Sequence, residues 1–147
     1  MKKVYIYSDG SSLGNPGAGG WGTVLKYNDT VKEISGGQAD TTNNQMELKG
    51  AIEGIKLLKE PCEVILTSDS KYVVQGINDW LTNWIKNNWR TAGKKPVKNL
   101  DLWQEYVKIS QQHNVQAFWV KGHAGHEENE RCDFLARDEA EKIKERL

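Results

Sequence analysis

The spacing of hydrophobic and polar residues predicts five strands in this chain. Short runs of β-branched and aromatic residues, bounded by turn-forming residues, favour strands over helices. The second and third runs are separated only by Asn28-Asp29-Thr30, which is typical of a hairpin. Residues 13–20 hold several glycines and a proline, so we expect no regular structure there. The expected strands cover residues 4–8, 21–27, 31–35, 63–67 and 115–120.

Helical periodicity separates the later strands. Apolar residues recur at intervals of three and four between Leu48 and Leu58, and Pro61 ends the pattern, which predicts a long helix. Strands that first follow one another and then alternate with helices indicate an α/β domain with a mixed sheet. We expect that sheet to be antiparallel at the start and parallel further on. The other expected helices cover residues 70–87, with an interruption near Asp79-Trp80, residues 100–111, and an amphipathic segment that buries Cys132, Leu135, Ala136, Ala140 and Ile143.

Composition narrows the class of protein. The chain has 147 residues, of which 37% are hydrophobic and 27% charged, so we expect a single domain over residues 1–147. Its apolar runs are too short for a membrane-spanning helix, and the N-terminus lacks the apolar core of a secretory signal. The two cysteines, Cys62 and Cys132, are too few for a disulfide scaffold, so we expect a cytoplasmic protein. We also expect a monomer, because no heptad pattern or long apolar patch indicates a partner.

Charge is balanced overall but uneven along the chain. Twenty basic and twenty acidic residues give zero net charge, which argues against a histone-like binder of nucleic acid. The segment 84–98, called the basic arm below, carries basic residues and no acidic one. These are Lys86, Arg90, Lys94, Lys95 and Lys98. Local contact with nucleic acid therefore stays open.

Four carboxylates lie at the edges of the expected core. Asp9 and Asp69 end two expected strands, whereas Glu47 and Asp133 lie at the margins of two helical apolar faces. Each one alone is also explained as a turn residue or a solvated helix charge. If they converge, their mutual repulsion requires a cation, and oxygen ligands favour Mg²⁺ or Mn²⁺. Two such ions, roughly 4 Å apart, can activate a water and stabilise a leaving oxygen in phosphoryl displacement.

Several ordered motifs resemble one family. They are Asp9-Gly10-Ser11, the glycine-rich run 14–20, the run 41–48, Thr67-Ser68-Asp69-Ser70, and Val120-Lys121-Gly122-His123 with Asn129-Glu130-Arg131-Cys132-Asp133. Together they resemble the type 1 ribonucleases H of bacteria, from Tyr5 to about Ala140. The resemblance implies a ribonuclease H-like α/β fold, with a five-stranded mixed sheet flanked by helices. It further implies an endonuclease that hydrolyses the RNA strand of RNA–DNA hybrids with two Mg²⁺ ions, or Mn²⁺ in their place, leaving 5′-phosphate and 3′-hydroxyl ends.

The resemblance also assigns roles to single residues. Asp9, Glu47, Asp69 and Asp133 match the family's catalytic, metal-binding carboxylates, and His123 matches its mobile histidine, which assists proton transfer or product departure. Contacts with the RNA strand through its 2′-hydroxyls fall on Ser12, Gly14, Asn15, Asn43, Asn44 and Lys71. Contacts with the DNA strand fall on Thr42 and Asn99, which match a phosphate pocket, and on Tyr72 and Trp80, which match groove-lining aromatics. The basic arm resembles a substrate-binding protrusion, although Trp84 and Trp89 within it are equally explained by packing.

Other interpretations remain beside this one. A non-cleaving module that binds hybrids would keep the fold without needing all four carboxylates. A related nuclease or strand-transfer enzyme acting on DNA would not need Asn15, Asn43 and Asn44. A zinc site at His123, His126 and Cys132 has a usable spacing but no second cysteine cluster. A nucleotide-binding P-loop is excluded, because the glycine-rich run lacks the Gly-Lys-Ser/Thr ending.

Overall fold

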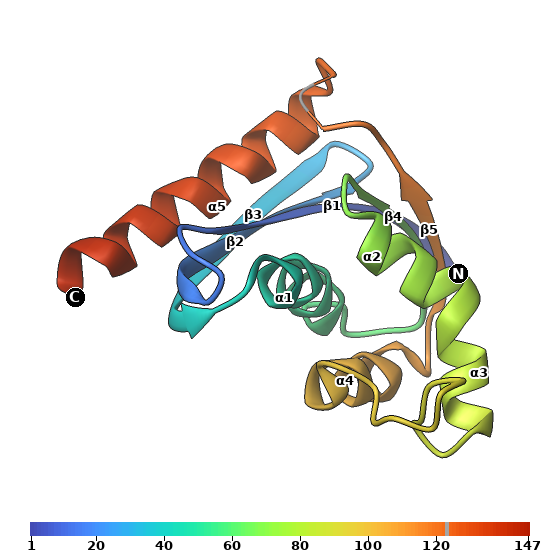
Figure 1. Ribbon diagram of the computed structural model, residues 1–147. Helices are drawn as coiled ribbons and strands as arrows, with labels where there is room; N and C mark the ends of the chain where they lie inside the picture. The colour runs from blue at the N-terminus through green and yellow to red at the C-terminus, as the bar shows by residue number, and fades with distance from the viewer. Residues whose placement is uncertain (123) are drawn as a thin grey trace.

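The computed structural model describes residues 1–122 and 124–147, and within them a five-stranded sheet forms the centre of the molecule (Figure 1). The strand order across the sheet is β3-β2-β1-β4-β5. The pairs β1–β2 and β2–β3 are antiparallel, and the pairs β1–β4 and β4–β5 are parallel. The predicted α/β fold with a mixed sheet is therefore confirmed. The strands are β1 (Lys2–Ser12), β2 (Gly17–Tyr27), β3 (Thr30–Thr41), β4 (Cys62–Ser68) and β5 (Asn114–Trp119).

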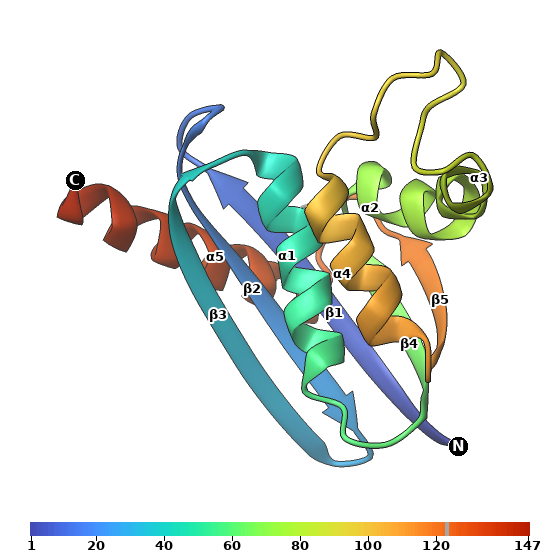
Figure 2. The same cartoon turned by 90° about the horizontal axis from the view of Figure 1, so that it is seen from below.

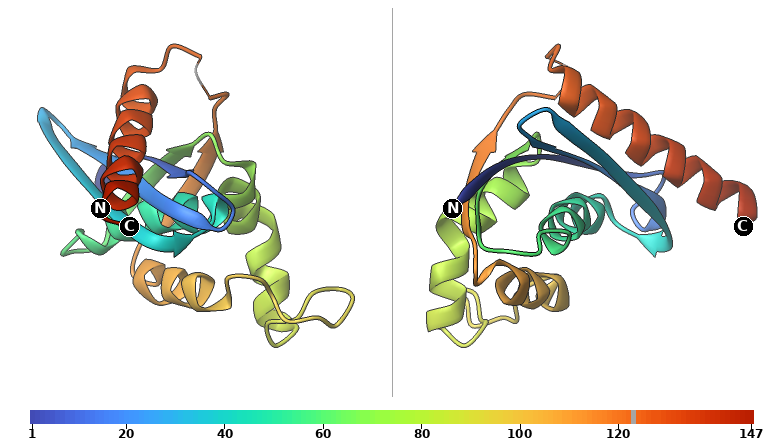
Figure 3. Two further views of the ribbon diagram at one scale, coloured as in Figure 1. Left: turned by 60° about the vertical axis from the view of Figure 1, so that its left-hand side comes forward. Right: turned by 180° about the vertical axis from the view of Figure 1, so that it is seen from behind.

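Helices cover both faces of the sheet. The long helix α5 (Glu127–Arg146) packs on β1, β2 and β3, on the face away from α1 and α4, as both views of Figure 3 show. On the other face, α1 (Asn43–Lys56) packs on β1 and β2, and α4 (Leu100–Ser110) lies beside α1 (Figure 2). The segment after β4 comprises α2 (Lys71–Gln75), the π-helical turn η1 (Gly76–Trp80) and α3 (Leu81–Lys86). The turn η1 is the interruption predicted near Asp79-Trp80.

The start of α1 is determined by its own sequence. The Thr42 hydroxyl accepts the Gln45 N–H at 3.2 Å, and the Gln45 side chain accepts the Thr42 N–H at 3.3 Å. This capping box satisfies two N–H groups that the beginning of a helix leaves unpaired. The apolar face of α1 buries Leu48, Ala51, Ile52 and Ile55 in the core. Glu47 is adjacent to that face and is itself buried.

The prediction that residues 13–20 are irregular is wrong for the part that begins β2. The helix α5 lies so close to β2 that a Cβ at Gly20 would be 2.4 Å from Ala136 O, and one at Gly22 would be 2.5 Å from Cys132 O. Glycine therefore occupies the strand because the helix leaves no space for side chains. Since Gly22 is also the Cα partner of Asp9 across β1 and β2, this contact brings the start of α5 beside Asp9.

Aromatic side chains fill the core between the sheet, α1 and α4. Trp103 is completely buried, and the Trp84 ring meets it edge to face at a centroid distance of 5.4 Å. Trp84 and Trp89 are both partly buried against the core. Of the two equal interpretations of these tryptophans, packing is therefore observed. No helix of the described part of the chain is both long and apolar enough to cross a membrane.

Candidate active site

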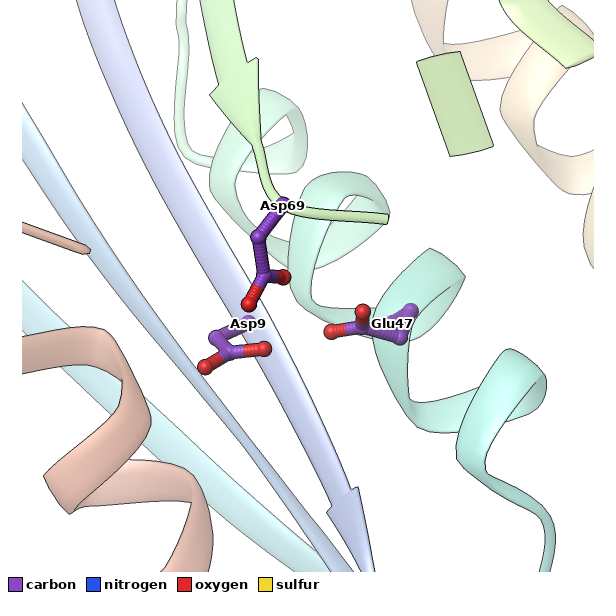
Figure 4. Close-up of side chains that lie close together, drawn as sticks. All are labelled: Asp9, Glu47 and Asp69. Atoms are coloured by element: carbon purple, nitrogen blue, oxygen red, sulfur yellow. The ribbon is translucent and has the colours of Figure 1, made fainter. Parts of the chain in front are cut away.

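Three carboxylates, from three separate parts of the chain, meet at the carboxyl end of strand β4 (Figure 4). Asp9 lies in β1, Glu47 in α1, and Asp69 directly after β4. One ligand oxygen from each lies within 4.8 Å of the others. Because Ser8 and Ser68 are Cα partners in the parallel β1–β4 pair, the aspartates that follow them lie side by side. The structure thus brings together three of the four expected carboxylates, called the acidic cluster below.

Gly10 allows α1 to come this close to β1. A Cβ on Gly10 would lie 2.3 Å from Glu47 N and 2.4 Å from Met46 C. The Gly10 N–H donates to Asp9 Oδ1 at 2.8 Å and also to Glu47 Oε1. One backbone amide therefore links two carboxylates, and a side chain at position 10 would push them apart.

Asp133, the fourth expected carboxylate, lies near the acidic cluster but outside it. It lines a small cavity together with Asp9, Asp69 and Asn129. Its Oδ2 lies 2.9 Å from an Arg137 guanidinium nitrogen, one turn further along α5. Asp133 therefore reaches the site from the opposite face of the sheet to Glu47, and in this structure its carboxylate is paired with an arginine.

Burial and mutual repulsion favour the protonated forms of Asp9 and Glu47 by raising the pKa of each carboxyl. Burial raises the pKa of Asp9 to about 7, the charge of Asp69 adds to this rise, and hydrogen bonds from Glu47 and the Gly10 N–H oppose it. Burial also raises the pKa of Glu47 well above its usual value, with further contributions from Asp9 and Asp69. Such shifts are typical of carboxylates brought together for a function, since stability alone disfavours them.

The acidic cluster fits a divalent cation. Asp69 Oδ1 is buried and has no hydrogen-bond partner among the described residues, and the same is true of both polar side-chain atoms of Asn129. An unpaired buried carboxylate oxygen is costly, and a bound cation would remove that cost. The donors are all carboxylate oxygens, which suit Mg²⁺ or Mn²⁺ better than softer metals.

We expect the metal-free protein to lose stability as the pH rises from 5 to 8. The Asp9 carboxyl is ionised above about pH 4 in the unfolded chain, whereas in the folded chain it keeps its proton up to about pH 7. The free energy of unfolding therefore falls over this pH interval, by roughly 2 kcal/mol. Urea denaturation in the presence of a chelator measures this loss against an Asp9→Asn variant, in which it should be smaller, because only Glu47 then keeps a raised pKa. Parallel pH profiles for the two proteins would contradict the raised pKa.

The residues expected at the RNA strand lie on both sides of the acidic cluster. The turn after β1 is joined to the start of α1 by the Asn43 N–H, which donates to Asn15 Oδ1 at 3.3 Å. Gly14 belongs to the same turn, and the hydroxyl of Ser12, the last residue of β1, donates to Gly14 O. Asn44 is exposed next to Asn43 on α1. Lys71 lies on the other side, in α2, with its ammonium 4.9 Å from the centre of the Trp119 ring.

The residues expected at the DNA strand form a second group. Asn99, directly before α4, donates through Nδ2 to the Tyr72 hydroxyl oxygen at 3.0 Å. The Tyr72 and Trp80 rings meet edge to face, with centroids 6.0 Å apart. Thr42 caps α1, which lies beside α4. The structure therefore brings Asn99, Tyr72 and Trp80 into one connected group, with Thr42 on the adjacent helix.

Comparison with known proteins identifies the family. The family model described as RNase H matches residues 1–141 of the chain. The chain belongs to the ribonuclease H family. The members of this family are endoribonucleases, so the chain is an enzyme of that class, as its motifs indicated.

Individual relatives agree with this assignment. A ribonuclease H of Campylobacter concisus (strain 13826) is 63% identical over 145 residues, which cover 99% of this chain and 97% of that protein. LC9-RNase H1, described as a type 1 RNase H with the type 2 active-site motif, has a TM-score of 0.87 at 34% identity, over 97% of this chain and 74% of that one. LC11-RNase H1, solved in complex with an RNA/DNA hybrid, has a TM-score of 0.68 at 23% identity, over 96% of this chain and 99% of that one. The last comparison shows the shared fold.

The histidine expected in a type 1 ribonuclease H, His123, lies outside the described residues, so its role stays a prediction. Its neighbours Gly122 and Ala124 line the same small cavity as Asp9 and Asp69. The basic arm carries its five cationic side chains on exposed positions, and the loop after α3 extends away from the sheet (Figure 2).

Two residues that shape this ribonuclease H site escaped the sequence analysis. Gly10 was noted only as part of a motif, although its missing side chain is what lets Glu47 reach Asp9. Trp119 was regarded as a strand residue, yet its indole N–H donates to Asp69 O at 3.0 Å while its ring is 45% exposed. The sequence offered only a tryptophan at the end of an expected strand, because its contact with Asp69 depends on the register that pairs Trp119 with Ser68.

Proposed function

We propose that this chain is an endonuclease that hydrolyses the RNA strand of RNA–DNA hybrids with two divalent metal ions, leaving 5′-phosphate and 3′-hydroxyl ends. The observation that carries the proposal is the meeting of Asp9, Glu47 and Asp69, with ligand oxygens within 4.8 Å of one another. The unpaired Asp69 Oδ1 supports it, because a buried carboxylate oxygen without a hydrogen-bond partner among the described residues is available to a metal ion. We expect Mg²⁺ in this site, with Mn²⁺ able to replace it.

The role of the protein's own side chains in this reaction is to hold the metal ions in fixed positions. Bound ions would supply positive charge at both the attacking and the leaving oxygen of an in-line displacement. Asp9, Glu47 and Asp69 are preorganised to hold them, because their backbone positions are determined by strand register and by the contact at Gly10. Asp133 would complete the set after it leaves Arg137. From the resemblance, we assign His123 to proton transfer or product departure.

Recognition of a hybrid requires that the two strands be distinguished. We propose that the RNA strand lies over the side that faces the acidic cluster, where amides and hydroxyls meet its 2′-hydroxyls. These residues are Ser12, Gly14, Asn15, Asn43, Asn44 and Lys71. The DNA strand would then follow Thr42, Asn99, Tyr72 and Trp80, and the basic arm would add contacts with phosphates.

A comparison of substrates tests this function. With Mg²⁺ and an end-labelled RNA–DNA hybrid, duplex RNA or duplex DNA, we expect cleavage of the hybrid's RNA strand only, because only the hybrid offers both kinds of strand. Gel mobility before and after phosphatase treatment identifies the product ends. Binding of the hybrid without cleavage, in Mg²⁺ or Mn²⁺, would instead favour a non-cleaving module. Cleavage of duplex DNA would favour a strand-transfer relative.

A further inference from the structure

The side chain of Gln45, at the third position of α1, makes hydrogen bonds in two directions. Its Oε1 accepts the Thr41 hydroxyl at 2.8 Å and the Thr42 N–H at 3.3 Å. Because an amide oxygen facing two donors defines which way the group points, Nε2 must point the other way. There it donates to Asn99 Oδ1 at 3.2 Å. Gln45 thus connects the start of α1 with the residue that precedes α4.

The chain of hydrogen bonds continues from Asn99 to Tyr72. Asn99 has a left-handed backbone (φ 57°), which asparagine tolerates well, and its Nδ2 donates to the Tyr72 hydroxyl oxygen at 3.0 Å. The Trp103 indole N–H donates to the same oxygen at 2.8 Å. A tyrosine hydroxyl offers two lone pairs and one hydrogen. Both lone pairs are therefore used, and among the described residues nothing accepts the hydrogen, so Tyr72 can only donate to an additional partner.

The adjacent cleft has little free positive charge. It is lined by Gln38, Gln45, Lys49, Asn99 and Asp101, among others. The Lys49 ammonium lies 3.3 Å from Glu53 on the same helix, and Asp101 adds a negative charge. A phosphate bound near Asn99 therefore depends on neutral donors, and neutral donors bind only when they are correctly oriented.

We propose that Gln45 is a positioning residue for the DNA strand of the substrate: it orients Asn99 and, through Asn99, keeps the Tyr72 hydroxyl as a donor to a backbone phosphate. This inference rests on the proposed function, in which Asn99 and Tyr72 contact that strand. It adds a residue that does not itself touch the substrate. It also joins two contacts with the DNA strand, that of Asn99 before α4 and that of Tyr72 on α2, into one hydrogen-bonded unit.

The competing explanation is that Gln45 only caps α1, so the variants must separate these two roles. Gln45→Glu keeps an acceptor for the cap but replaces the donor that Asn99 needs. Gln45→Met removes both interactions without adding charge. Asn99→Gly removes the Asn99 side chain while tolerating the left-handed backbone. Gln104→Met, at an exposed position of α4, is the matched control for Gln45→Met.

The experiment measures kcat and KM for the hybrid, and the melting temperature, for each variant and for the double variants with Asn99→Gly. We expect both Gln45 variants to raise KM about fivefold, the loss expected for one hydrogen bond, with a much smaller change in kcat. Gln45→Glu should keep the melting temperature, and Gln45→Met should lower it. In the Asn99→Gly background neither substitution should change KM by more than about twofold, since residues that act as one unit are not additive.

Three results would overturn the proposal in distinguishable ways. Unchanged KM in both Gln45 variants, with a raised KM in Asn99→Gly, would leave Gln45 as a cap only. A KM that rises equally for Gln45→Glu with and without Asn99 would indicate direct repulsion of the phosphate. An unchanged KM in Asn99→Gly would remove the DNA-strand site from the proposed function, and this inference with it.

Discussion

An Asp69→Asn variant should cleave the RNA–DNA hybrid roughly a thousandfold more slowly than the unaltered chain, or worse. Asp69 Oδ1 is buried and unpaired among the described residues, so it is available to a cation, and its carboxylate is one of only three that meet in the acidic cluster of the described chain. The amide has the same shape but no charge, and its NH₂ group cannot bind a metal. Steady-state cleavage in Mg²⁺ measures the loss as kcat/KM.

The same variant should remain folded, which separates a catalytic effect from a structural one. Burial is the main cause of the raised pKa of Asp9 and Glu47, and the charge of Asp69 adds to it. Removing that charge relieves repulsion, so the free energy of unfolding at pH 8 should not fall. Asp29→Asn, an exposed position in the turn between β2 and β3, is the matched control and should keep full activity. An Asp69→Asn enzyme within about tenfold of the unaltered chain would show that the essential ligand lies elsewhere.

Gly10→Ala should lower activity roughly a hundredfold and reduce stability by about 1–3 kcal/mol. The added Cβ would lie 2.3 Å from Glu47 N, and backbone atoms of α1 cannot rotate out of its way. The helix must then move away from β1, which takes Glu47 away from Asp9. Cleavage rates and urea denaturation measure the two effects.

Gly93→Ala provides the control for this substitution. The nearest atom to a Cβ at Gly93, in the basic arm, is Thr91 Oγ1 at 3.9 Å, an ordinary contact. That variant should therefore keep its stability, and its activity should fall far less than that of Gly10→Ala. A Gly10→Ala protein that matches it in both measurements would contradict the role assigned to the close approach of α1 and β1.

Much of the fold could be predicted because its signals are local. Short runs of β-branched and aromatic residues located every strand, although β1 and β3 extend several residues beyond the expected 4–8 and 31–35. The apolar periodicity from Leu48 to Leu58 located α1. The length of β2 could not be predicted, because Gly17–Gly20 show no apolar pattern. Gly20 lies in the strand against α5, which is more than a hundred residues away in the sequence, and Gly19 lies against Thr41 and Ser11. Contacts between residues so distant in the sequence produce no pattern in the neighbouring residues.

The acidic cluster was predicted only in part for a similar reason. The position of Asp9 and Asp69 at strand ends was visible in the sequence, but their meeting depends on the register that pairs Ser8 with Ser68. The pairing of Asp133 with Arg137 was not predicted, although the spacing of four residues on a helix allows it. The orientation of Gln45 was unpredictable, because it depends on Asn99, which is distant in the sequence.

The four expected ligands come from both faces of the sheet, Glu47 from α1 on one and Asp133 from α5 on the other. A chain emerging from the ribosome would expose Asp9, Glu47 and Asp69 well before α5 is made, so a nascent chain cannot yet assemble the full set. A cut within the basic arm would divide the ligands between two pieces, with β5 and α5 on the second. Each piece alone would be inert towards RNA. Nuclease activity would then measure the association of the two pieces.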